Sequence, residues 1–406
     1  MKSVEYSNEQ LTYKMSGNTK GKLLAMILLG VISTVLSFFV LHEPSRSGHS
    51  NAGWSVLLIG VFLALGVSIA GLFFTAISHI TGSKWSITVR RLAEAFSKFL
   101  PVGIVLLAVI VFFGVHDLYE WSHTEVVAKD HLLQHKSGWL NVPFFPIRLL
   151  VITGIWFFFG HLFLKNSVSQ DESKDINLSL KNNGLSAKFI LVFALTFSIV
   201  AYDLLMSLTP HWFSTMWAVY IFAGIYQSTF AVMLILIYHL KKNGYYGDAV
   251  NENHIHDLAK FMMSFCIFWA YVGFSQFMLI WYANMPEETF WFEQRLIGGW
   301  APISYAIPFI KFVIPFLLLV NRPNKRNIDF LVKVSSWILF TEFVELFWIV
   351  FPSNYETFSM TSMVLAFGGT IGVMGLFGFM VLKGLEKYKL IPVGDPRLED
   401  CLHHHQ

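Results

Sequence analysis

The chain has 406 residues, of which 55% are hydrophobic, 17% aromatic and only 14% charged. Soluble domains carry about 25% charged residues, so this composition and the mean hydropathy of +0.56 exclude a soluble globular protein and predict a polytopic membrane protein. The formal net charge of +3 is spread around apolar segments and gives no reason to expect nucleic-acid binding. The two Cys residues form no Cys-x-x-Cys or Cys-x-x-Cys-His motif, so the sequence encodes neither an iron–sulfur cluster nor a covalently attached haem.

Ten apolar segments have the length of a membrane span, which predicts an all-α integral membrane protein with about ten transmembrane helices. The predicted spans cover residues 22–41, 52–80, 92–115, 146–164, 187–208, 214–240, 258–283, 299–320, 328–350 and 357–382. This division leaves an N-terminal tail over 1–21, a polytopic transmembrane domain over 22–382 and a C-terminal tail over 383–406.

The Lys and Arg residues are distributed asymmetrically around these spans. Most of the 29 fall in alternate connections, beginning with the N-terminal tail. The opposite connections hold only Arg46, Lys129, Lys136, Arg148 and Arg295. Because cytoplasmic loops are enriched in Lys and Arg, this asymmetry predicts that both termini lie in the cytoplasm.

Three polar connections between the predicted spans lead to further predictions. The outer connection 116–141 is rich in His, but its spacing matches no tight metal-ligand motif, so we expect a solvated or partner-facing loop. The inner connection 83–96 predicts a short amphipathic segment that leads into the third span, in which Arg90 and Arg91 contact lipid phosphates or, as the less favoured alternative, a partner. The inner stretch 170–183 is the most polar part of the chain and predicts a mobile loop.

The stretch 199–216 ends one apolar segment, turns at Pro210 and begins the next. Asp203 lies inside the apolar run, about two helical turns before Pro210. An acid within a membrane helix is costly and usually faces a partner or a water path. With Tyr202 and His211 close by, Asp203 and His211 are candidates for an outer-side proton or quinone site. The alternative is a buried Asp satisfied by a neighbouring hydroxyl or His.

The eighth and ninth spans contain three more ionisable residues. Glu342 and Glu345 are three residues apart and share a helix face, and Lys311 lies at mid-depth in the preceding span. A Lys–Glu pair between neighbouring helices would lower the cost of both charges. The pair is either a structural ion pair or part of a polar path, which the same helix would continue through Ser335, Ser336 and Thr341.

Two further sets of polar residues are candidates for a site. His79, His161 and His239 lie at the inner ends of three spans, where facing His pairs can ligate a b-type haem. Nothing in their spacing specifies a pair, which favours satisfied polar residues or steps of a proton path. The second set is a polar strip of Tyr271, Ser275 and Gln276, which either joins helices by hydrogen bonds or lines a quinone or proton cavity.

Two long motifs point to a known family. The first combines Asp203 with Met206-Ser207 and Pro210-His211-Trp212-Phe213-Ser214-Thr215-Met216. The second combines His256-Asp257-Leu258, Phe268-Trp269-Ala270-Tyr271, Phe274-Ser275-Gln276, Leu279-Ile280-Trp281-Tyr282-Ala283-Asn284 and Pro286-Glu287-Glu288-Thr289. Together they resemble the NrfD-like membrane subunits of alternative complex III. The similarity is strong over 203–289, and the length and Lys/Arg pattern look more like the ActF subunit than the longer ActC.

The resemblance implies two four-helix bundles plus extra helices, in a subunit of a quinol:cytochrome c or other electron-acceptor oxidoreductase of the bacterial inner membrane. It implies that electrons pass from quinol to iron–sulfur clusters and c-type haems on partner subunits. Those partners would be an iron–sulfur protein, c-type cytochromes and an ActC-like subunit, besides lipids. This chain would bind no redox centre of its own, with quinone as a candidate ligand, and its polar interior would support proton translocation.

An ion-coupled secondary transporter is the alternative function, because the ionisable residues within the spans would also suit coupled ion transport. That function predicts half-helices interrupted near mid-membrane. Gly368-Gly369 and Gly372 in the last span are a weak signal of such a break. A scaffold that only anchors partner proteins is a third possible function. The ionisable residues within the membrane spans argue against it.

Overall fold

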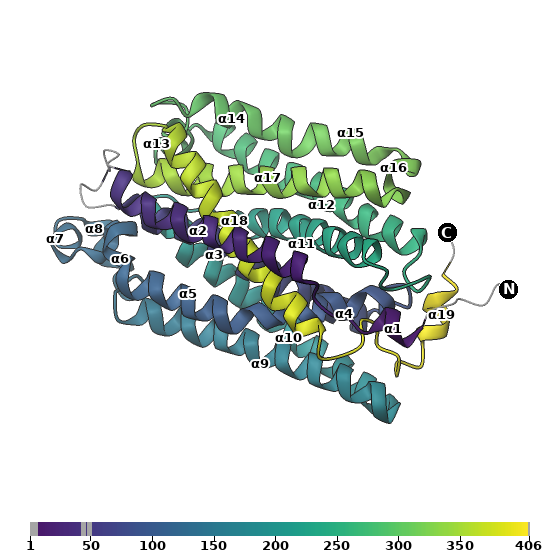
Figure 1. The fold of residues 1–406 in the computed structure, drawn as a ribbon. Helices are drawn as coiled ribbons and strands as arrows, with labels where there is room; N and C mark the ends of the chain where they lie inside the picture. The colour runs from purple at the N-terminus through teal and green to yellow at the C-terminus, as the bar shows by residue number, and fades with distance from the viewer. Residues whose placement is uncertain (1–6, 42–45, 47–50, 405–406) are drawn as a thin grey trace.

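The computed structural model describes residues 7–41, 46 and 51–404, and these form helices and loops without strands (Figure 1). Ten helical segments in this part of the chain are long and apolar enough to cross a membrane, which confirms the predicted all-α, multi-pass membrane protein. The spans are α2 (Gly17–Val40), α3 (Ala52–Ile80), α4–η1–α5 (Ile87–Ala95, Phe96–Phe99, Leu100–Phe113), α9 (Phe144–Ser173), α10 (Ile176–Leu204), α11 (Trp217–Lys242), α12 (Glu252–Ala283), α14–η4–α15 (Ala301–Pro308, Phe309–Val313, Ile314–Val320), α17 (Ile328–Asn354) and α18 (Met360–Leu385). The ends of the two predicted tails, residues 1–6 and 405–406, lie outside the described residues.

The spans pack as two groups of four helices and one further pair. The first group contains α3, α4–α5, α9 and α10, and the second contains α11, α12, α14–α15 and α17. The pair α2 and α18 lies against α3. This arrangement agrees with the two four-helix bundles plus extra helices that the resemblance implies. Helix α3, which is apolar all round, is buried almost throughout because it contacts α2, α5, α10, α11 and α18.

Glycines set the close approach of α2 and α18. A Cβ atom on Gly30 would lie 2.2 Å from the Cα of Gly372, and one on Gly368 would lie 2.1 Å from the Ser33 hydroxyl oxygen. Small residues let two membrane helices approach until their backbones touch. Gly368, Gly369 and Gly372 therefore lie in a continuous helix and serve packing, where the transporter hypothesis predicted an interruption.

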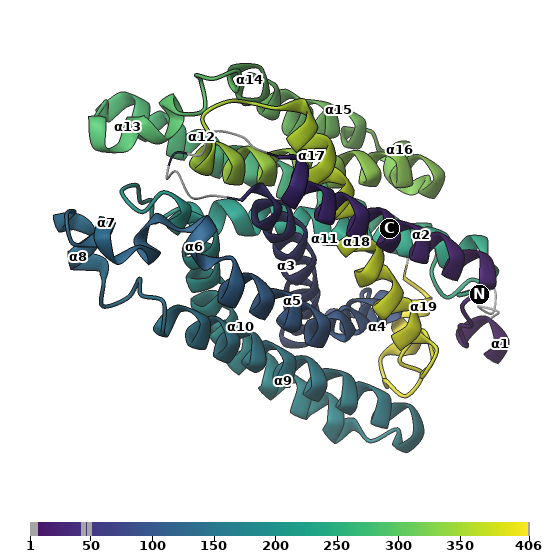
Figure 2. The same cartoon turned by 60° about the vertical axis from the view of Figure 1, so that its left-hand side comes forward.

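Both described ends of the chain lie at the same end of the molecule (Figure 1). There the backbone N–H of Leu390 donates to the carbonyl of Leu11, and the N–H of Tyr246 donates to the carbonyl of Gln10, both at 2.9 Å. We call this end, built from 7–16, 243–251, 322–326 and 386–404, the terminal side (Figure 1). The opposite end, with α6 (Val115–Leu118), η2 (Glu120–Ser122), α7 (Thr124–Val127), α8 (His131–Lys136), η3 (Met206–Leu208) and α13 (Pro286–Glu293), is the far side (Figure 2).

Three short helices belong to the terminal side, and the polar stretch 170–183 is also structured. The short helices are α1 (Asn8–Leu11), α16 (Arg322–Arg326) and α19 (Leu398–Leu402). The predicted mobile loop is a helical hairpin in which only a tight turn separates α9 from α10. Lys174 turns the chain with a φ of 53°, and the Asp175 side chain caps α10 by accepting from the N–H of Asn177. The adjoining ends of α9 and α10 are polar, and a polar stretch between two apolar segments has the composition of a loop. Composition alone therefore predicted a loop here.

Candidate functional site

A buried ionic cluster occupies the middle of the second four-helix group. Lys311 of η4 donates through Nζ to the Glu342 carboxylate at 2.6 Å and also to the Glu345 carboxylate, both on α17. The three residues are at most 2% exposed. The structure thus brings together the three ionisable residues that the sequence singled out in these two spans.

Aromatic side chains complete the coordination of Glu345. The Tyr220 hydroxyl and the Trp269 indole N–H, the latter at 2.8 Å, both donate to Glu345 Oε1. The Lys311 ammonium lies 4.9 Å from the centroid of the Trp269 ring, within range of a cation–π interaction. The cluster is therefore formed by four helices of one group: α11, α12, the broken eighth span and α17.

Gly224 on α11 makes room for this cluster. A Cβ atom there would lie 2.8 Å from Glu342 Oε2 and 2.9 Å from Lys311 Nζ, so any side chain would displace the ion pair. Tyr220 and Gly224 are four residues apart and share a helix face. Tyr220, Gly224 and Trp269 were not among the predicted site residues, although Trp269 lies in the second motif. The spacing of Tyr220 and Gly224 was the available signal for the first two.

A π turn positions Lys311, and its cause is visible in the sequence. Pro315 has no N–H, so the carbonyl of Lys311 loses its helical donor. The N–H of Ile314 donates to Phe309 five residues back, which leaves the carbonyl of Ile310 free as well. The Cys266 thiol lies 3.5 Å from the Lys311 carbonyl oxygen, and the Trp337 indole N–H donates to the Ile310 carbonyl at 2.8 Å. Neighbouring helices thus satisfy the backbone groups that the π turn exposes.

The hydroxyl residues expected to extend the cluster along α17 bond elsewhere. Ser336 donates to the carbonyl of Val332, and Thr341 donates to the carbonyl of Ile338. Ser335 lies 3.8 Å from the sulfur of Met262. The contacts of these three residues therefore do not connect them to one another. The polar path that the sequence suggested through Ser335, Ser336 and Thr341 is not formed by these contacts.

Asp203 lies at the far-side end of α10, where α9 and the outer connection meet it. Arg148 donates through Nε to Asp203 Oδ2 at 2.7 Å, and the Trp139 indole N–H donates to Oδ1 at 3.0 Å. The Arg148 guanidinium also lies 4.1 Å from the Trp139 ring centroid. Asp203 is 1% exposed and both of its oxygens are engaged, which favours a structural role. Its partners are an Arg and a Trp, where the sequence suggested a hydroxyl or a His.

His211 belongs to a separate contact. Its Nε2 lies 2.5 Å from Asp130 Oδ2, and this hydrogen bond lowers the pKa of Asp130 below its usual range. Tyr202, the other expected neighbour of Asp203, donates its hydroxyl to the carbonyl of Thr215. Asp203 and His211 therefore each contact the outer connection 116–141, but with different partners. The expected joint cluster of the two is not formed.

The expected polar strip on α12 is split between faces of the helix. Tyr271 is 66% exposed, Ser275 is half-buried and Gln276 is buried. Five residues separate Tyr271 from Gln276, which puts them on different sides of a helix with 3.6 residues per turn. Tyr271 lies on the outer surface of α12 with Phe274, a surface suited to lipid.

The three His residues that the sequence predicted at the inner ends of spans also lie in separate surroundings. His79 stacks on Phe163 with their ring centroids 6.2 Å apart, and His161 lies beside Phe157. His239 lies 3.5 Å from the Thr19 hydroxyl through its Nε2. The described residues contain no group of three or more His, Cys, Asp or Glu side chains placed to hold a metal ion. The arrangement assigns each of these His residues its own local contact.

Arg90 and Arg91 correct an expectation about lipid. Both guanidiniums are at most 1% exposed and pair with carboxylates. Arg90 donates to Asp395 at 2.8 Å, and Arg91 donates to both oxygens of Asp171 at 2.8 and 3.1 Å. Each also forms an ion pair with Glu94 on the same helix. The prediction that they meet lipid phosphates was wrong, because the C-terminal tail and α9 cover them.

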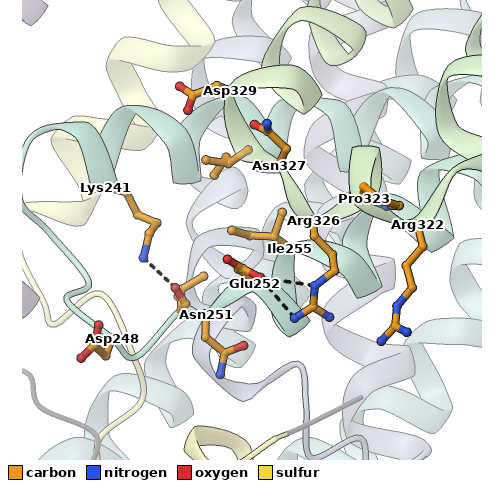
Figure 3. A pocket seen from close by; sticks show the side chains of 12 residues that line it. Lys241, Asp248, Asn251, Glu252, Ile255, Arg322, Pro323, Arg326, Asn327 and Asp329 are labelled. Atoms are coloured by element: carbon orange, nitrogen blue, oxygen red, sulfur yellow. Dashed lines mark hydrogen bonds and ion pairs between the residues drawn. The ribbon is translucent and has the colours of Figure 1, made fainter.

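A pocket of about 810 Å³ lies at the terminal side of the second four-helix group (Figure 3). Glu252 of α12 and Arg326 of α16 line this pocket and form an ion pair at 3.2 Å. The other residues lining it are Lys241, Asp248, Val250, Asn251, Ile255, Arg322, Pro323, Asn327, Ile328 and Asp329. Three of the helices around this pocket, α11, α12 and α17, also form the Lys311 cluster.

The sequence matches no protein-family model and no curated protein. The class that the fold and the site define is a multi-pass α-helical membrane protein with a buried ionisable cluster between its spans. Any narrower function rests on the geometry of that cluster and on the two motifs.

Proposed function

We propose that the chain is an ActF-like, NrfD-like membrane subunit of an alternative complex III, a respiratory quinol:electron-acceptor oxidoreductase. Iron–sulfur clusters and c-type haems on partner subunits would carry the electrons. The membrane would be the bacterial inner membrane, with the terminal side facing the cytoplasm. The observation that carries the proposal is the Lys311–Glu342–Glu345 cluster, supported by the motif resemblance.

The charge balance of the cluster explains why it suits proton movement. Two carboxylates and one ammonium leave one negative charge uncompensated when all three groups are ionised. An uncompensated charge in an apolar interior is costly, so a proton bound to one carboxyl lowers the free energy of the cluster. The cluster can bind and release that proton while partner subunits oxidise quinol. Tyr220, bonded to Glu345, is a further group through which the proton can pass.

The transporter alternative receives less support from the helices. Transporters of that type place unwound segments at mid-membrane. Here the interrupted eighth span is a π turn whose exposed carbonyls are bonded to Cys266 and Trp337. The glycines of α18 lie in a continuous helix. The respiratory subunit is therefore the function that we propose.

The proposal is tested by purifying the protein through this chain in a mild detergent from intact membranes. A subunit gel and an optical spectrum are then recorded. We expect several copurifying subunits and reducible c-type haem bands, because this chain lacks the Cys motifs for redox centres of its own. A colourless preparation with a single subunit would contradict the proposal and favour a transporter.

A further inference from the structure

Two polar residues of α11 lie next to the ionic cluster on its terminal side. Helix α11 runs from the far side at Trp217 to the terminal side at Lys242. Gly224, on this helix, touches the cluster. Ser228 follows it by four residues, which places Ser228 on the same face and about 5–6 Å further along the axis. Gln227 lies beside it, and both residues are fully buried.

Among the described residues, these two side chains have no nitrogen or oxygen partner, and the weakly polar Cys266 thiol is the neighbour of the Gln227 amide. The Gln227 amide nitrogen and oxygen and the Ser228 hydroxyl are all buried without a hydrogen bond to another nitrogen or oxygen atom. Their neighbour Thr229 differs, because its hydroxyl donates to the carbonyl of Ile225 at 2.9 Å. Buried polar groups are nearly always satisfied, and where the protein offers no partner an ordered water supplies it. Gln227 and Ser228 therefore indicate a site for buried water.

The surroundings connect this site to the π turn that carries Lys311. The Gln227 amide lies beside the Cys266 thiol, and that thiol lies 3.5 Å from the Lys311 carbonyl oxygen. On the other flank of the cluster, Glu345 is already bonded to Tyr220 and Trp269. The terminal-side flank is thus where the cluster has polar neighbours with unused hydrogen-bonding capacity.

The same group of helices opens at the terminal side. The pocket of about 810 Å³ lies between the ends of α11, α12, α16 and α17, with charged side chains around it (Figure 3). Water enters a site of that polarity and size readily. The pocket and the Gln227 site lie at different depths of one helix group, on the same side of the cluster.

We propose that Gln227 and Ser228 bind buried water on the terminal-side flank of the Lys311–Glu342–Glu345 cluster, and that the cluster exchanges protons through this water. The bound water donates a proton to a cluster carboxylate and takes one from the next water on the terminal side, so the site remains neutral. The proton relay rests on the proposed function, whereas the water site rests on the unpartnered atoms alone.

The test uses the full chain in lipid nanodiscs, with its partner subunits where they copurify. An electron cryo-microscopy map that resolves water shows whether density lies at hydrogen-bond distance from the Gln227 amide. Infrared spectroscopy in D₂O measures how fast the cluster carboxyls exchange their proton. The variants are Gln227→Leu and Ser228→Ala. Thr229→Val is the matched control, because that hydroxyl is buried on the same helix but bonded within it.

We expect water density at Gln227 in the natural protein and in the control, its loss in Gln227→Leu, and carboxyl exchange at least tenfold slower in Gln227→Leu. A dry Gln227 in the natural protein would overturn the water site. Water with unchanged exchange in Gln227→Leu would overturn the relay. Ser228→Ala, which removes one hydroxyl, keeps the test decisive if Gln227→Leu does not fold. Neither readout needs quinol oxidation, so failure of the respiratory function is recognised separately.

Discussion

At the scale of single residues, Asp203 and Arg148 show how a charge is kept inside an apolar protein. The two side chains are 1% and 7% exposed and are joined by a hydrogen bond of 2.7 Å. The Trp139 indole bonds the second carboxylate oxygen, and its ring lies against the guanidinium. Removing one member of such a pair leaves the other charge buried without compensation, which is far more costly than removing both.

Asp203→Asn should therefore act on stability. We expect the free energy of unfolding to fall by about 3 kcal/mol, because Arg148 loses its counter-charge. The double variant Asp203→Leu/Arg148→Met should recover most of that loss. Thermal or denaturant unfolding in detergent micelles measures both. Tyr202→Phe is the control, since it removes one hydroxyl contact on the adjacent residue. Equal stability of Asp203→Asn and this control would show that the pair does not hold the helix end.

The residues of the central cluster could be predicted only in part. Lys311, Glu342 and Glu345 were recognisable because charges in neighbouring spans must find each other in an apolar interior. Tyr220 and Trp269 were not, because an aromatic residue in a membrane helix is as favourable toward lipid as toward the bundle. The partner of Asp203 was misassigned because Arg148 is 55 residues away and reads as an outer-loop cation. Rotation of each helix about its axis decides such contacts, and uniformly apolar helices leave that rotation undefined by sequence.

At the scale of elements, the ten spans followed directly from the length of the apolar runs, but their ends and contacts did not. The polar ends of α9 and α10 extend the helices beyond the apolar layer, and α4 begins before the predicted third span. The close contact of α2 with α18 depends on Gly30 and Gly372 facing each other, which requires both helix rotations to be known. The glycines alone equally suited a broken helix.

Gly30→Val tests the packing of α2 against α18. Its Cβ atom would lie 2.2 Å from the Gly372 backbone, so the helices must separate. We expect a loss of about 1–3 kcal/mol in unfolding free energy, the usual cost of overpacking. Gly21→Val on the same helix is the control, since a Cβ atom there meets nothing within 4 Å. Unfolding by denaturant in micelles compares the two, and similar midpoints would mean that the helix contact is looser than the structure has it.

At the scale of the whole molecule, the C-terminal tail closes the terminal side over two buried guanidiniums. Asp395 is 4% exposed and bonds Arg90 at 2.8 Å. Burial by itself raises the pKa of Asp395, but the Arg90 and Arg397 guanidiniums outweigh it and hold that pKa well below the usual 3.8. A carboxyl with a lowered folded-state pKa stabilises the fold fully above its unfolded pKa and loses that effect as the pH falls through the folded-state value.

The tail should therefore stay docked throughout pH 5–8 and loosen only in acid well below pH 4, as Asp395 becomes protonated. Asp395→Asn should mimic the acid state at neutral pH and raise deuterium exchange across 386–404. Asp400→Asn in α19 is the matched control, because its pair with Lys84 is more than half exposed and contributes little. Hydrogen–deuterium exchange read by mass spectrometry compares the variants. If residues 386–404 stay protected from exchange in Asp395→Asn, contacts other than the Asp395–Arg90 pair hold the tail in place.

We propose that the Lys311 cluster moves protons while partner subunits carry electrons. The most direct test of this proposal is the number of protons released per quinol oxidised, measured in vesicles that contain the purified complex with Glu342→Gln. Glu287→Gln on the exposed far side is the control for loss of a carboxylate. We predict that Glu342→Gln keeps quinol oxidation but releases fewer protons per electron than the natural protein and the control. Equal proton release in all three would contradict the proposed role of the cluster.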